Sequence, residues 1–106
     1  MSYAAIDPLV TAWADRHDLT LFREWAGAEV RFCYTSSDTE CFQIVVREPH
    51  SEEVKIEAFS IETTNDEEFQ QSWDVPVASV GQGLENALAT VEGWKRGIGR
   101  LSANDS

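Results

Sequence analysis

The stretch EVRFCYTSSDTECFQIVVRE, residues 29–48, decides the fold, because it combines two alternating segments with a short polar loop between them. Alternation of apolar and polar residues with a period of two is the pattern of a half-buried β-strand. The apolar sets that we expect to face the core are Val30, Phe32 and Tyr34 in the first segment and Phe42, Ile44 and Val46 in the second. The stretch therefore predicts an antiparallel hairpin with one face on a hydrophobic core.

The numbering of these residues also constrains the register of the hairpin. Opposed residues of an antiparallel pair point to the same face, so both apolar sets face the core only in certain registers. A loop over 36–38 sets Cys33 opposite Cys41 on the face away from the core, and the next permitted register sets them diagonally. We expect that outer sheet face, a candidate surface for a homodimer or another partner, to include Arg31, Cys33, Cys41, Gln43 and Val45.

The rest of the chain predicts two long helices, two more strands and a helical turn. Asp7 before Pro8 indicates an N-cap, and the apolar stripe from Ile6 to His17 predicts a helix over 8–17. Residues 19–25 and 53–63 have strand-forming composition, 64–73 predicts a short helix, and a closing helix runs from 79 to a stop at Gly97 and Gly99. The strand over 53–63 needs a bulge near 57–58 to turn Phe59 inward; otherwise Phe59 lies on the outer face.

These elements together define an α+β fold. We expect an N-terminal helix, a four-stranded antiparallel β-meander and a C-terminal helix, with both helices packed on one face of the sheet. The domain spans residues 1–101, and 102–106 form a flexible tail.

The sequence offers little for chemistry. The residues that could bind zinc are Cys33, Cys41, His17 and His50, but they belong to separate parts of the predicted fold. A redox pair of the two cysteines would need a nearby cation, for which Arg31 is the candidate, and simple hairpin positions are the favoured interpretation. No nucleophile, phosphate-binding or metalloprotease motif is present. We therefore predict no catalytic residues, no cofactor and no metal.

The net charge of −11 comes from the middle of the 106-residue chain. Residues 38–92 hold thirteen acids against Arg47 and Lys55 alone. Such a surface repels nucleic acids and anionic membranes and attracts basic proteins. With no apolar run near the roughly 20 residues that span a bilayer and no export signal at the start, the sequence predicts a cytoplasmic protein with a basic protein partner, no direct nucleic-acid binding and no membrane.

One acidic segment also contains aromatic residues and is a possible partner surface. Its residues are Asp66, Glu67, Glu68, Phe69, Trp73 and Asp74. In one interpretation the aromatic side chains belong to the core beneath a short helix. In the other they anchor a basic partner that the acids attract.

From these features we predict a non-enzymatic, acidic protein-binding module, similar in role to an immunity protein or a chaperone. The alternative is a small-molecule-binding protein or small enzyme with a pocket between the helices and the sheet. That pocket would be lined by Trp13, Phe32, Tyr34, Phe42 and Trp94. A third hypothesis is that the acidic surface mimics nucleic acid.

Overall fold

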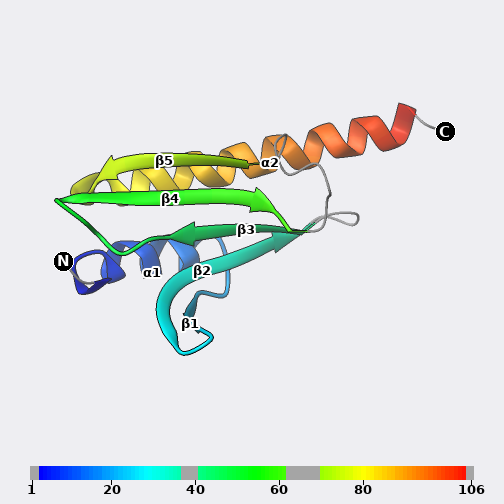
Figure 1. Ribbon diagram of the computed structural model, residues 1–106. Helices are drawn as coiled ribbons and strands as arrows, with labels where there is room; N and C mark the ends of the chain where they lie inside the picture. The colour runs from blue at the N-terminus through cyan, green and yellow to red at the C-terminus, as the bar shows by residue number, and fades with distance from the viewer. Residues whose placement is uncertain (1–2, 37–40, 62–69, 105–106) are drawn as a thin grey trace.

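A computed structural model describes the backbone of residues 3–36, 41–61 and 70–104, with side chains through Arg96 except that of Ser36. Within these residues the chain forms an antiparallel meander in the order β1-β2-β3-β4-β5 (Figure 1). The strands are β1 (Phe22–Trp25), β2 (Ala28–Ser36), β3 (Cys41–Val46), β4 (Glu53–Ser60) and β5 (Gln70–Pro76). The helices are η1 (Tyr3–Ala5), α1 (Asp7–Arg16), η2 (Val77–Ser79) and α2 (Val80–Asn104). The predicted α+β class is confirmed.

The described part of the sheet has five strands, whereas the sequence predicted four. The additional strand is β5, which overlaps the end of the helix expected over 64–73. It pairs along β4, with Trp73 opposite Ile56 and Val75 opposite Val54, so its two apolar residues face the core. Polar residues fill four of its other positions (Gln70, Gln71, Ser72 and Asp74), as is common in an edge strand, and they hid the strand pattern. Residues 62–69 lie outside the described residues.

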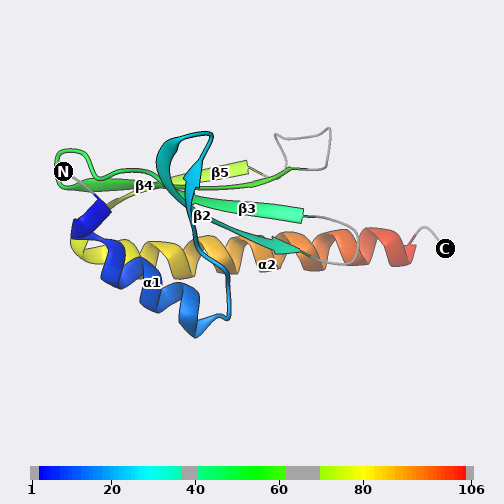
Figure 2. The same ribbon diagram turned by 90° about the horizontal axis from the view of Figure 1, so that it is seen from below.

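The two helices lie on one side of the sheet, as Figure 2 shows. Helix α1 begins at Asp7 after an N-cap at Ile6, so the predicted Asp7 cap is wrong, and the Asp7 carboxylate binds Arg31 instead. Helix α1 buries Val10, Trp13 and Ala14 in the same core cluster as residues of the sheet and of α2.

Helix α2 packs closely on β4 and β5 at Gly83. Its buried stripe is Val80, Leu84, Ala87 and Val91, at the spacing of one helical face. A Cβ at Gly83 would lie 2.8 Å from Ile56 Cδ1 and 3.1 Å from a methyl group of Val75, so only glycine fits without adjustment. The helix continues through Gly97 and Gly99 to Asn104, beyond the predicted stop and into the predicted tail, whose residues 105–106 lie outside the described residues.

The register of β2 and β3 reverses the predicted faces of β2. Cys33 lies opposite Ile44 and Thr35 opposite Phe42, so Cys33, Thr35 and Arg31 face the helices. Phe32 and Tyr34 lie on the outer face instead. Alternation alone would place Arg31 outside, but here Arg31 is buried with its charge met by Asp7 and Glu29, and the more apolar set of β2 lies outside.

The predicted bulge in β4 is also absent. Pairing of β3 with β4 is continuous from Phe42 opposite Ser60 to Val46 opposite Ile56. Ala58 and Ser60 therefore point inward and Phe59 outward, which was the alternative prediction. The register shift lies in the β1–β2 pair instead, between Phe22 and Glu24.

Candidate functional site: the outer face of the sheet

The face of the sheet opposite the helices carries a hollow between the β1–β2 hairpin and strands β3 and β4. The hairpin curls toward this side, away from the helices (Figure 2). The hollow has a volume of about 290 Å³. Its lining residues are Trp25, Val30, Phe32, Tyr34, Gln43, Val45, Arg47 and Phe59. Aromatic rings thus dominate a concave part of the surface.

The rings of the hairpin hold one another in place. Phe22 stacks on Phe32 with 5.1 Å between ring centroids, and Trp25 meets Phe32 edge-on at 6.1 Å. Tyr34 also meets Phe32 edge-on, at 5.5 Å. These distances and angles are those of favourable aromatic pairs. The rings therefore form a packed cluster of fixed shape.

The bulge in β1 explains how these rings reach one face. In a regular strand, residues three apart point to opposite faces. Phe22 pairs with Phe32 and Trp25 with Ala28, so the extra residue between them brings both Phe22 and Trp25 to the outer face. A sequence pattern of strict alternation cannot reveal this, and the sequence analysis therefore missed Phe22 and Trp25.

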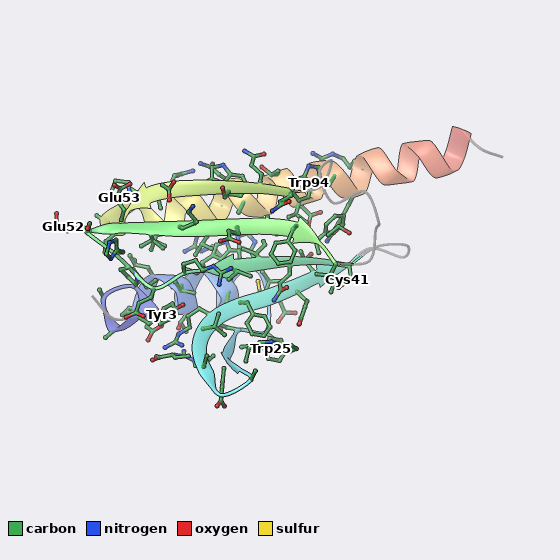
Figure 3. All side chains as sticks on the ribbon, viewed as in Figure 1. Tyr3, Trp25, Cys41, Glu52, Glu53 and Trp94 are labelled. Atoms are coloured by element: carbon green, nitrogen blue, oxygen red, sulfur yellow. The ribbon has the colours of Figure 1, made fainter. Side chains whose placement is uncertain are left out.

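Exposure is uneven across the aromatic cluster. Phe32, at its centre, is only 3% exposed, whereas Trp25 is 66% exposed and Phe22 41%. Figure 3 shows Trp25 beside the β1–β2 hairpin, far from Glu52 at the turn between β3 and β4. Exposed aromatic residues around a buried centre are typical of surfaces that bind other molecules.

An ion pair forms the polar side of the hollow. Arg47 donates from Nε to Glu57 Oε1 at 3.0 Å and from Nη2 to Glu57 Oε2 at 3.3 Å. The hydrogen bond to Glu57 raises the pKa of Arg47 above its usual value. Because the two charges cancel, this side of the hollow offers no unopposed charge for an anionic ligand.

Of the predicted outer-face residues, Cys41, Gln43 and Val45 lie on that face, but Arg31 does not. Its guanidinium is buried under α1 and all five of its N–H groups are bonded, to Asp7 twice, to Glu29, and to the carbonyls of Arg23 and Val30. It also lies 4.4 Å from the centre of the Tyr3 ring. The bond to Arg31 lowers the pKa of Asp7. Arg31 thus links the N-terminal segment to β2 through its bonds to Asp7 and its contact with the Tyr3 ring.

The two cysteines lie on opposite faces and form no disulfide. Cys33 is 1% exposed, and burial raises the pKa of its thiol to about 12. Cys41 is half-buried on the outer face. The predicted opposition of the two thiols is therefore wrong, and a redox pair between them is excluded by geometry.

The other predicted ligand and pocket residues are dispersed. His17 Nε2 lies 2.8 Å from Glu85 Oε1 on α2, and in the described part of the chain no three potential metal ligands gather. Of the proposed inner pocket, Trp13 and Phe42 are fully buried in the core, whereas Phe32 and Tyr34 are on the other face. The five residues therefore do not line one cavity.

The predicted acidic partner surface is only partly described. Asp66, Glu67, Glu68 and Phe69 lie outside the described residues. Trp73 packs against the core, and exposed Asp74 lies opposite Lys55 in the β4–β5 pair. Among the described members, Asp74 alone is well placed to meet a partner.

Comparison of the chain with protein-family profiles, with curated proteins and with solved structures finds no match. Over the described residues, every helix is too short or too polar to cross a bilayer.

Proposed function

We propose that this protein is a non-enzymatic, acidic protein-binding module that docks a basic partner on the outer face of its sheet. The observation that supports the proposal is the aromatic hollow, with Trp25 exposed above a buried Phe32. Rigid aromatic side chains around a desolvated centre are the usual anchors of protein interfaces. An immunity protein and a chaperone are the two roles that fit.

The net charge of −11 supports a basic partner. A surplus of negative charge accelerates the approach of a positive surface and repels an acidic one. Around the hollow itself the Arg47–Glu57 pair is neutral. Long-range attraction thus comes from the whole molecule, and close contact comes from the rings.

Affinity capture with a matched pair of variants tests the proposal. The wild-type chain, Trp25→Ala and Leu9→Ala are immobilised and exposed to native extract at low and high salt. Leu9 is the control because it is exposed to a similar extent as Phe22 but lies on α1. We expect the wild type and Leu9→Ala to retain a basic protein at low salt and lose it at high salt, and Trp25→Ala to retain little. Equal retention by Trp25→Ala contradicts docking at the outer face.

A further inference from the structure

We infer that the hollow receives a single aromatic side chain of the partner, from a segment with basic residues on both sides of that ring. This inference rests on the proposed function and specifies the chemistry of the partner. Its basis is the size of the hollow, the orientation of the rings that line it, and the charges on the β1–β2 hairpin.

The size of the hollow limits its occupant. Pockets for drug-sized ligands and cofactors measure about 300–1,000 Å³, and this hollow has about 290 Å³. It matches one large side chain better than a cofactor. It is also open to solvent, so a side chain that projects from another protein can enter.

The rings that line the hollow favour an aromatic occupant over an aliphatic one. Trp25 and Tyr34 stand nearly perpendicular to Phe32, at 84° and 82°. A fourth ring placed among them meets both edges and faces, the arrangement in which aromatic pairs gain beyond simple burial. Because the cluster is already packed, little conformational freedom is lost when the ring enters.

The hairpin beside the hollow favours basic flanking residues. Glu24, next to Trp25 on the edge strand β1, lies directly opposite Glu29 on the other face of the hairpin, and like charges in that position repel each other. The Glu29 carboxylate already binds Arg31 at 2.9 Å. Glu24 is exposed and makes no ion pair within the described residues. Because β1 is the edge strand, a lysine or arginine that flanks the partner's aromatic anchor can reach around this edge and relieve the repulsion.

The Arg47–Glu57 pair disfavours two other occupants. An anionic ligand meets a guanidinium whose Nε and Nη2 already donate to Glu57. A cation inserted among the rings finds no carboxylate among the described residues that line the hollow, and the nearby Glu57 already accepts from Arg47. A neutral ring inside the hollow with cations outside it suits both the lining and the hairpin.

The test uses a heptapeptide with one central tryptophan, a glycine on each side and two lysines at each end. It is titrated into the isotope-labelled full chain, and the amide and indole signals are followed by NMR. We expect the shifts to fall on the Trp25 indole and on the amides of Gln43, Val45 and Phe59. The indoles of Trp13, Trp73 and Trp94 are internal references and should move little.

Three peptide variants separate the contributions. Alanine in place of the tryptophan should weaken binding at least about tenfold, since the anchor is removed. Leucine should weaken it by roughly three- to tenfold, because the aromatic contacts are lost but apolar burial is kept. Glutamates in place of the four lysines should weaken it by about tenfold or more at low salt. Equal binding of the leucine or the glutamate peptide overturns the inference.

Two protein variants test the role of the hairpin charge. Glu24→Gln should weaken binding of the lysine peptide by roughly two- to fivefold. Glu52→Gln is the matched control, since Glu52 is an exposed acid in the turn at the far end of the sheet (Figure 3), and should change little. An equal effect of both variants shows that only net charge matters and contradicts a site beside Trp25.

The outcomes separate this inference from the proposed function. If capture depends on Trp25 but no peptide shifts its indole, the inference fails and the proposed function stands. If neither capture nor peptide binding depends on Trp25, both fail. If the same signals move with protein concentration alone, a second copy of the chain occupies the hollow and the inference is wrong.

Discussion

The two faces of the sheet carry similar side chains, but the helices cover only one of the two faces (Figure 2). Each face has a cysteine, and each face has an arginine whose guanidinium binds a carboxylate. The Arg31 side chain, under the helices, is 5% exposed and bonded at every N–H, whereas the Arg47 side chain on the outer face is 53% exposed and donates twice to Glu57. The helix layer, not the residue type, therefore decides which groups are fixed in the structure and which can meet a partner.

The two cysteines test this comparison of the two faces most directly. At pH 8 a thiol with a pKa of about 12 is ionised in roughly one molecule in ten thousand, and Cys33 is also covered by the helices. A thiol reagent should therefore modify Cys41 in the native protein and reach Cys33 at least about a thousandfold more slowly, through unfolding. Mass spectrometry against time measures both rates.

A Cys41→Ser variant is the control for that experiment. It should remain unmodified under native conditions and take up one equivalent of reagent in denaturant. Rapid native modification of Cys33 would show that β2 has the register predicted from the sequence, with Cys33 on the outer face.

The two arginines should differ next most strongly, in how much each stabilises the folded chain. Arg31→Met leaves the Asp7 carboxylate and two backbone carbonyls without their donor, and removal of one partner of a buried ion pair costs about 3–5 kcal/mol. Arg47→Met removes an exposed pair and should cost less than about 1 kcal/mol. Denaturant unfolding of both variants measures the comparison. Equal losses would mean that the outer face is covered as tightly as the inner one; if Arg31→Met does not fold, Arg31→Lys should show the same ranking.

Part of this architecture was predictable from the sequence. The hairpin over residues 29–48 and the helix behind Pro8 follow from alternation and from helix-start signals, and both are present. The faces of β2 were not predictable in the same way, because a charged residue such as Arg31 is normally placed outside. Its burial requires, besides the neighbouring Glu29, an acceptor from Asp7, which only the folded chain brings to Arg31.

The candidate site was less predictable than the fold. Its aromatic members sit in β1, β2 and β4, and their convergence depends on a bulge in β1 and on the absence of one in β4. A bulge changes the face of each residue after it, and residues of many types tolerate one. Phe59 was therefore placed correctly only as an alternative, and Trp25 was missed.

Two glycines of α2 test how closely the helix covers the inner face. Gly83→Ala brings a methyl group to 2.8 Å from Ile56, so we expect a loss of about 1–3 kcal/mol despite the better helix propensity of alanine. At Gly81 nothing lies within 4 Å of the added methyl group, and Gly81→Ala should gain up to about 1 kcal/mol. Thermal or denaturant unfolding measures both. A gain at both positions would show that α2 moves away from the sheet easily.

Trp25→Ala should have the smallest effect on stability and makes the comparison of the two faces complete. The side chain is 66% exposed, so its removal should change the free energy of unfolding by less than about 1 kcal/mol, as for other surface substitutions. Leu9→Ala on α1 should change it by a similar amount. A loss above about 2 kcal/mol would mean that the Trp25 ring belongs to the structural core of the hairpin. Any loss of partner binding in that variant would then follow from unfolding of β1. A small loss, together with lost binding, places Trp25 in recognition and leaves the helix-covered face to maintain the fold.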